Sequence, residues 1–148
     1  MMPILIVDDD PDDSSMTQKA LEKNQVPNPL VFLKNGEEVM DYLAKLGTYV
    51  NGPGSKWPAL ILLDLNMPKM DGRTALELIK TSDQYKSIPV VVLSTSCDVD
   101  EVSRIYGLGA NSYICKPTNF ENLVKMMGLL KSYWIGTVKL PYVGNEVF

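Results

Sequence analysis

The chain has 148 residues, of which 14 are Lys or Arg and 18 are Asp or Glu, so its formal net charge is -4. This length fits one domain, and an apolar share of 45% is sufficient for a hydrophobic core. Because the net charge is negative, we do not expect the chain to bind nucleic acid. It has no apolar run of about 18 residues and no secretory signal pattern, so we expect a cytoplasmic domain that does not insert into a membrane.

Short apolar runs predict five strands. Four of them span residues 3–7, 30–33, 59–63 and 90–93, and a weaker fifth spans residues 112–115. The four are almost continuously apolar, which is typical of parallel strands that are covered on both faces.

Helical patterns lie between these runs. Asp10 can cap a first helix, with Pro11 at its first position, where the missing N–H of proline costs nothing. A second helix is predicted by apolar residues at the spacing i, i+3, i+4 and i+7, namely Val39, Tyr42, Leu43 and Leu46.

Two capping-box signatures predict helices near the end of the chain. Asp98 with Glu101 opens one helix, and Thr118 with Glu121 opens the last. The last helix carries an apolar stripe as far as Trp134. The order is therefore strand then helix, five times, which predicts parallel strands in a three-layer α/β/α sandwich. We expect one domain over residues 1–134, a surface insertion at 47–58 and a C-terminal extension at 135–148.

Polar side chains follow the predicted strands, at the end of the sheet where open α/β proteins bind ligands. The first strand is followed by Asp8, Asp9 and Asp10, the third by the segment 64–68, the fourth by the segment 94–96 and the fifth by Lys116 and Pro117. Each segment alone has an ordinary structural explanation, such as a helix cap or a loop acid. Their joint occurrence at successive strand ends indicates one site.

This set of groups suits phosphoryl transfer. Crowded carboxylates favour a hard divalent cation such as Mg²⁺ or Mn²⁺. Asp64 can then act as a nucleophile that forms an acyl phosphate, while Ser94 and Lys116 can hold the phosphate oxygens. The chain contains no histidine, which excludes a Ser-His triad, a His-ligated zinc and a phosphohistidine on this chain.

Four segments carry a resemblance to the receiver domain of two-component response regulators. They are Ile4 to Asp10, Leu62 to Gly72, Pro89 to Ser94 and Gly109 to Pro117. The resemblance covers residues 2–134. It implies a flavodoxin-like, doubly wound five-stranded parallel sheet in the order 2-1-3-4-5, within the three-layer sandwich.

The resemblance also implies roles for single residues. Asp8 and Asp9 resemble the acidic pair that holds magnesium, Asp64 the phosphoacceptor, and Asn66 the residue whose main-chain carbonyl contacts the metal. The remaining roles are those of a switch hydroxyl, a switch aromatic, a phosphate-binding lysine and a proline that is usually cis, which fall on Ser94, Tyr113, Lys116 and Pro117.

The chain departs from the commonest family pattern at two positions. Ser94 stands where threonine is more frequent, and it keeps the hydroxyl. Thr95 stands where a small alanine or glycine is common, so its side chain bears on access to the phosphoryl site.

The insertion at 47–58 and the ending from Tyr133 to Pro141 resemble the small receivers that partner bacterial phytochromes. This likeness implies a phytochrome-type sensor histidine kinase, or a histidine phosphotransferase, as partner. Such a protein catalyses only its own phosphotransfer and dephosphorylation. The apolar residues of the extension further predict a homodimer.

Two alternatives remain open at this point. One is a phosphorylation-independent pseudo-receiver, which would bind partners without using the acidic site. The other is a phosphohydrolase of the haloacid-dehalogenase type, which needs an acid two positions after its nucleophile, where this chain has Asn66. Cys97 and Cys115 lack metal-ligand spacing, and we expect them to be reduced structural thiols.

Overall fold

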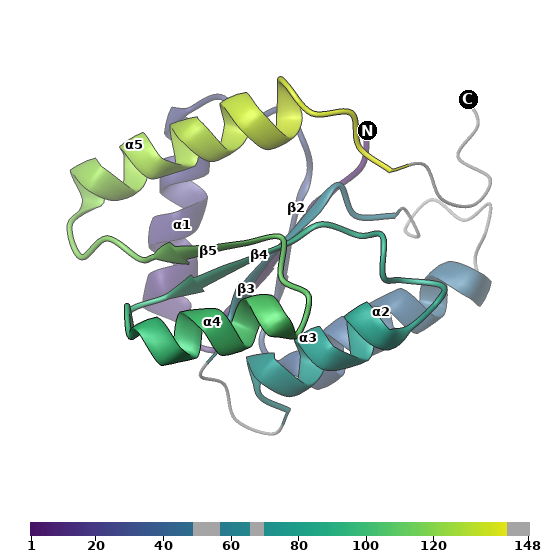
Figure 1. Ribbon diagram of the computed structural model, residues 1–148. Coiled ribbons are helices and arrows are strands. Elements are labelled where there is room, and N and C mark those ends of the chain that lie inside the picture. The colour runs from purple at the N-terminus through teal and green to yellow at the C-terminus, as the bar shows by residue number, and fades with distance from the viewer. Residues whose placement is uncertain (49–56, 66–69, 142–148) are drawn as a thin grey trace.

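The computed structural model describes residues 1–48, 57–65 and 70–141. Its sheet has five parallel strands in the order β2-β1-β3-β4-β5 (Figure 1). The strands are β1 (Ile4–Val7), β2 (Leu30–Leu33), β3 (Leu60–Asp64), β4 (Val90–Ser94) and β5 (Ser112–Cys115). The flavodoxin-like fold and its strand order are thereby confirmed.

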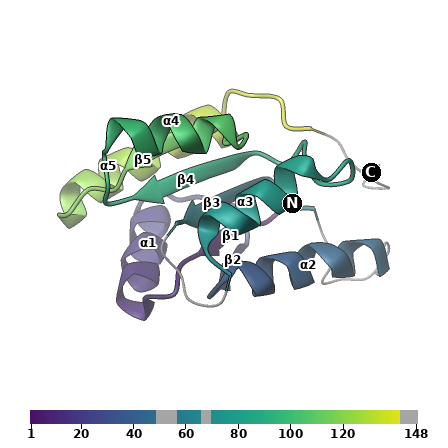
Figure 2. The same cartoon turned by 60° about the horizontal axis from the view of Figure 1, so that its bottom comes forward.

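Helices cover both faces of this sheet (Figures 1 and 2). One face carries α1 (Pro11–Lys23) and α5 (Phe120–Leu130), and the other carries α2 (Gly36–Thr48), α3 (Gly72–Thr81) and α4 (Val99–Gly107). A turn of π-helix, η1 (Lys131–Ile135), continues α5. Among the described residues, no helix is long and apolar enough to cross a membrane.

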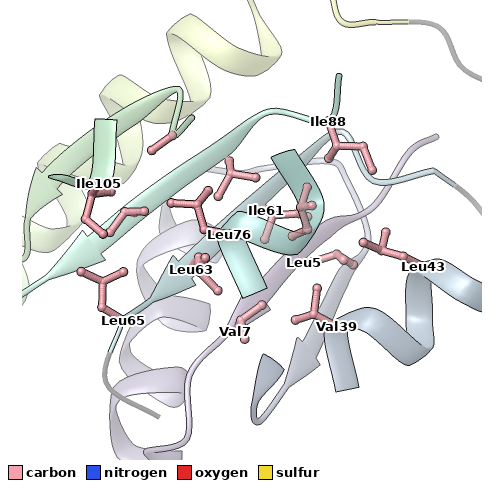
Figure 3. Packing of buried hydrophobic residues seen from close by; sticks show 14 of the residues in the cluster. Leu5, Val7, Val39, Leu43, Ile61, Leu63, Leu65, Leu76, Ile88 and Ile105 are labelled. Carbon is pink, nitrogen blue, oxygen red and sulfur yellow. The ribbon is translucent and has the colours of Figure 1, made fainter. Parts of the chain in front are cut away.

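Each face of the sheet has its own hydrophobic core. On the side of α2, α3 and α4, alternate residues of the central strands, including Leu5, Ile61 and Leu63, pack against Leu43 and Leu76 (Figure 3). The residues between them face α1 and α5. This alternation requires both faces to be apolar, which explains the near-continuous apolar runs in the sequence.

Strand position in the sheet determines burial. Every residue of β1 and β4 is buried, and β3 is buried except for its last residue. The outer strands β2 and β5 are only partly covered. The carboxyl end of the sheet therefore combines rigid central positions with a more accessible outer strand.

The helix caps agree with the sequence at two positions and differ at one. Asp10 accepts hydrogen bonds from the main-chain N–H groups of Asp12 and Asp13, and Asp98 accepts one from Glu101. The cap of α5 is Asn119, which bonds to the N–H of Asn122, and not Thr118. Asn and Thr are both good caps, and the helix begins one residue later than the capping box suggested.

The expectation of reduced thiols is wrong for this structure. Cys97, in the loop after β4, forms a disulfide with Cys115 at the end of β5. The pairing of β4 with β5 brings Ser94 beside Cys115, so the loop that follows Ser94 meets the end of β5. The sequence separation of 18 between the two cysteines conceals this proximity in the sequence.

Candidate phosphoryl-transfer site

Three carboxylates converge at the carboxyl end of the central strands. Val7 pairs with Leu63, so Asp8 after β1 and Asp64 at the end of β3 lie side by side. One carboxylate oxygen from each of Asp8, Asp9 and Asp64 lies within 4.8 Å of the others. The structure thus brings together the acids that the sequence predicted to form one cluster.

A glycine fixes the position of the end of β3, where Asp64 lies. The N–H of Gly72, at the start of α3, donates to the carbonyl of Leu65 over 2.9 Å. A Cβ atom on Gly72 would lie 2.2 Å from the carbonyl oxygen of Asp64. Only a residue without a side chain permits this approach, which returns the chain to Asp64 after the loop.

Asp8 is the most deeply placed acid of the cluster, with 7% of its surface exposed. One of its carboxylate oxygens accepts a hydrogen bond from the N–H of Asp10 over 3.0 Å. The other accepts a hydrogen bond from the Lys116 ammonium over 3.1 Å. Both oxygens therefore have partners, as burial of a charged group requires.

Lys116 reaches the cluster from the end of β5. Its ammonium also pairs with Asp13, in the first turn of α1, over 3.4 Å. Burial alone would lower the pKa of Lys116, but the neighbouring carboxylates, above all Asp8, outweigh it and raise that pKa above its ordinary value. The lysine therefore remains a cation at the position where an anionic group would enter.

The donor set of the cluster fits a divalent metal ion. Three carboxylates close together offer only oxygen ligands, which hard cations such as Mg²⁺ and Mn²⁺ prefer. The side chain of Asp9 is exposed, whereas Asp8 and Asp64 are set deeper. Asp8, Asp9 and Asp64 could hold such an ion, and it would supply positive charge beside the carboxylate of Asp64.

The predicted switch residues lie beside the cluster, around the loop that follows β4. Ser94 is buried, and its hydroxyl accepts a hydrogen bond from the N–H of Ser96 over 3.1 Å. The hydroxyl of Tyr113 donates to the carbonyl of Ser96 over 2.7 Å. One loop residue thus links the hydroxyl and the aromatic side chain.

A hollow of ≈ 260 Å³ opens beside the acids, between α1 and β2. Asp8 and Asp9 line it together with Pro11, Phe32 and Lys34, among others. Its lining combines apolar side chains with the carboxylates of Asp8 and Asp9.

One predicted site residue is not described by the structure, and the predicted conformation of another differs. Asn66 lies outside the described residues. The Lys116–Pro117 peptide bond is trans, as is every peptide bond in the described ranges, so the expectation of a cis-proline is wrong for this structure. An X–Pro bond favours trans by about 0.5–1 kcal/mol unless its surroundings select the cis form.

Sequence reasoning missed the roles of Asp13 and of the Arg73–Glu101 ion pair. Asp13 is the second partner of Lys116. Glu101, predicted only as part of a helix cap, pairs with Arg73 and accepts from the Tyr113 hydroxyl. The position of Asp13, three residues after the Asp10 cap, is the one available signal, because the first turn of α1 begins beside the site.

Comparison with known proteins agrees with this fold and this site. Residues 4–128 match the family described as "Response regulator receiver domain", and the chain belongs to this family. It is a two-component response regulator with an acidic cluster formed by Asp8, Asp9 and Asp64.

The chain is similar to response regulator Rcp1 of Synechocystis sp., with 43% identity over 93% of this chain and 92% of Rcp1. The solved structure of the phosphorylated cyanobacterial phytochrome response regulator RcpA matches with a TM-score of 0.85 and 40% identity, over 95% of this chain and 99% of that one. The Mn²⁺-bound form of Rcp1 matches with a TM-score of 0.83 and 42% identity, over 96% and 100% of the two chains.

Proposed function

We propose that Asp64 accepts a phosphoryl group from a phosphohistidine of a partner sensor kinase, in a reaction that depends on Mg²⁺ or Mn²⁺. The observation that carries this proposal is the convergence of Asp8, Asp9 and Asp64 within 4.8 Å, with Lys116 bonded to Asp8. The Mn²⁺-bound structure of the similar Rcp1 and the phosphorylated structure of RcpA support it.

In the transfer, a carboxylate oxygen of Asp64 attacks the phosphorus atom. An O–P bond forms, the N–P bond of the phosphohistidine breaks, and its electron pair stays on the imidazole nitrogen. The metal would be held by Asp8, Asp9 and Asp64, with the main-chain carbonyl of Asn66, and when bound it would neutralise charge on the phosphoryl oxygens.

The chain's own cation and hydroxyl then hold the new acyl phosphate. Lys116 already points into the cluster and can exchange part of its contact with Asp8 for a phosphate oxygen. The Ser94 hydroxyl can turn from the N–H of Ser96 toward another phosphate oxygen. Phosphotransfer to Asp64 and loss of that phosphate are then the only reactions the protein catalyses.

The output would be a change in the face built by α4, β5 and α5. A phosphoryl group adds roughly -1.5 to -2 charges and three acceptor oxygens at Asp64. Movement of the Ser94 hydroxyl would release Ser96, to which Tyr113 is bonded, and so alter the position of the aromatic ring. The local charge is thereby converted into a change of surface.

The proposed partner is a phytochrome-type sensor kinase, or a histidine phosphotransferase, in the cytoplasm. The likeness to Rcp1 and to a phytochrome response regulator over almost the whole chain supports this choice. Phosphotransfer profiling against the kinases of the same organism would identify the cognate partner.

We also propose a receiver domain over residues 1–134 with an extension at 135–148, and a homodimer. Ile135 and Leu140 pack against the core between the sheet and α5, so the described part of the extension folds back on its own domain. Leu129 and Tyr133 are 73% and 56% exposed and remain available for a two-fold contact. Sedimentation of the full chain and of a Leu129→Lys/Tyr133→Lys variant tests this: the wild type should sediment as a dimer and the variant as a monomer, and a monomeric wild type at tens of micromolar would reject the dimer.

The central test replaces the acceptor. Asp64→Asn should take up no phosphoryl group from acetyl phosphate or a kinase, as measured by intact mass spectrometry. Asp83→Asn, which alters an exposed acid elsewhere, should be phosphorylated like the wild type. EDTA should stop the reaction and added Mg²⁺ should restore it. Full phosphorylation of Asp64→Asn would contradict the assignment.

A further inference from the structure

Two exposed cysteines meet beside the loop that carries the switch. Cys97 lies in the loop between β4 and α4, Cys115 is the last residue of β5, and both are exposed. Their Cα atoms are 5.6 Å apart, which is the usual separation in a disulfide, and the two are bonded. Accessible disulfides are the ones that cellular thiols can reduce.

The disulfide spans the region proposed to respond to phosphorylation. Residues 97–115 form a covalent ring that contains all of α4 and β5, including Tyr113. Cys97 directly follows Ser96, whose N–H and carbonyl contact Ser94 and Tyr113 respectively. Any displacement of this loop relative to β5 must therefore stretch or rotate the ring closed by the two sulfur atoms.

We propose that Cys97 and Cys115 form a reversible oxidation site, and that their disulfide restrains the β4–α4 loop and so opposes the phosphorylated conformation. The oxidation site stands on the position of the two cysteines alone. Its effect on the switch rests on the proposed function of Asp64.

The reaction is thiol–disulfide exchange with a low-molecular-weight disulfide such as oxidised glutathione. The thiolate of one cysteine attacks a sulfur atom of that molecule, forms a mixed disulfide and releases one small thiolate. The other protein thiolate then attacks the protein sulfur of the mixed disulfide and releases the second. The protein loses two protons and two electrons, the oxidant becomes two thiols, and excess reduced glutathione reverses both steps.

The coupling to phosphorylation has a definite sign. With the disulfide formed, Ser96 is held near β5, and the Ser94 hydroxyl stays bonded to its N–H. Reduction frees the loop, so the reduced protein should bind a phosphoryl mimic more tightly. By reciprocity, the mimic should favour the dithiol by the same factor.

The first experiment measures the oxidation site itself. The full chain is equilibrated in glutathione buffers of decreasing reducing power and analysed by intact mass after alkylation. We expect a loss of two hydrogens, a link between Cys97 and Cys115 on peptide mapping, and full reversal by reduced glutathione. Cys97→Ser and Cys115→Ser should each retain one alkylated thiol. Free thiols throughout the oxidising range, a bond that reduced glutathione does not break, or disulfides only between chains, would overturn the proposal.

The second experiment measures the coupling. The affinity for beryllofluoride, in the presence of Mg²⁺, should be about fivefold higher in the reduced protein, at the lower end of typical coupling between sites. The double variant Cys97→Ser/Cys115→Ser should bind equally under both conditions, like the reduced wild type. NMR shifts on binding should be larger between residues 98 and 115 in the reduced form.

The outcomes separate the two proposals. Equal beryllofluoride affinity in the two redox states would overturn the coupling, while the mass measurement still decides the oxidation site. Loss of beryllofluoride binding in both states, together with an unphosphorylated wild type, would overturn the proposed function and the coupling with it. In Asp64→Asn without beryllofluoride, Cys97 and Cys115 should be oxidised and reduced as in the wild type, because the oxidation site does not depend on Asp64.

Discussion

Strands β3 and β5 both deliver side chains to the site, but the sheet holds them very differently. The first four residues of β3 are fully buried between β1 and β4, and only Asp64 is partly exposed. The strand β5 is the outermost one, and each of its residues is partly or fully exposed. Asp64 therefore stands on a fixed element, and Tyr113 on one with fewer constraints.

This difference explains how one domain can combine chemistry with a switch. Metal binding and phosphoryl transfer require carboxylates that are held in place before the partner arrives. A conformational readout requires an element with two arrangements of similar free energy, and such elements come from the less stable parts of a fold. The central and outer strands satisfy these opposite requirements at the same end of the sheet.

The largest effect that would test the rigidity of the central strand comes from Gly72. In Gly72→Ala the added methyl group would lie 2.2 Å from the carbonyl oxygen of Asp64, and backbone atoms cannot yield as a side chain can. We expect a loss of about 3 kcal/mol in the free energy of unfolding, at the upper end for overpacking. Urea denaturation measures it.

Gly107 provides the matched control, because a Cβ there would meet nothing within 4 Å. Gly107→Ala, near the end of α4, should be neutral or more stable by about 0.4–1 kcal/mol, since alanine restricts the unfolded chain. Equal losses in both variants would mean that the end of β3 is no more constrained than the surface of α4.

Lys116 connects the two regions, since it extends from the outer strand to Asp8. Lys116→Met should cost about 2 kcal/mol of unfolding free energy, because it leaves a nearly buried carboxylate without its cation. Lys86→Met removes an exposed ion pair with Asp83 and should cost less than about 0.5 kcal/mol. A similar cost for both lysines would show that the Asp8 pair is solvated like a surface pair.

The pH dependence of the Lys116 effect has a definite sign. The pKa of Lys116 is raised in the folded protein above the ordinary value of 10.5. Its contribution is therefore fully present below pH 10.5 and is lost as the pH rises through the folded value. The stability difference between wild type and Lys116→Met, measured by denaturation, should stay constant from about pH 7 to pH 9 and shrink only in more alkaline solution.

Tyr113 tests the outer strand. Tyr113→Phe removes the hydrogen bond to the Ser96 carbonyl and should cost about 0.5–1.5 kcal/mol of unfolding free energy. It should also reduce the beryllofluoride-induced NMR shifts in α4 and β5 if the hydroxyl couples the loop to the strand. Tyr106→Phe is the control. It removes the hydroxyl that accepts a hydrogen bond from the main-chain N–H of Tyr113, and it should leave those shifts intact. Unchanged shifts in Tyr113→Phe would indicate that Tyr113 only fills space.

The central strands and their acids could be predicted from the sequence because their signals are local. A run such as residues 59–63 must be buried on both faces, and the acid that follows it must emerge at the end of the sheet. Parallel pairing puts the acids after β1 and β3 at the same edge of the sheet, and the strand order implied by the family resemblance makes these two strands neighbours.

Contacts of the outer strand and the helix starts could not be predicted in the same way, because they depend on register between distant segments. The bond between Cys97 and Cys115 requires the alignment of β4 with β5. The contact of Asp13 with Lys116 requires the placement of α1 over the sheet. Composition and periodicity predict neither the alignment of β4 with β5 nor the placement of α1 over the sheet.

Thr95 provides the smallest test, at the boundary between the rigid and the adjustable region. It follows Ser94 directly and its side chain is exposed, and the family resemblance implies that it borders the approach to Asp64. Its branched side chain is stiff at χ1, so its methyl group cannot easily move away from an incoming donor or water. Thr95→Ala should therefore speed both autophosphorylation by acetyl phosphate and autodephosphorylation by several-fold, about 1 kcal/mol or less in activation free energy. Transfer from a docked phosphohistidine should change less, because docking aligns the reacting groups beforehand. Both rates are measured for wild type and variant in one magnesium buffer, and equal or slower rates in the variant would show that Thr95 does not control access.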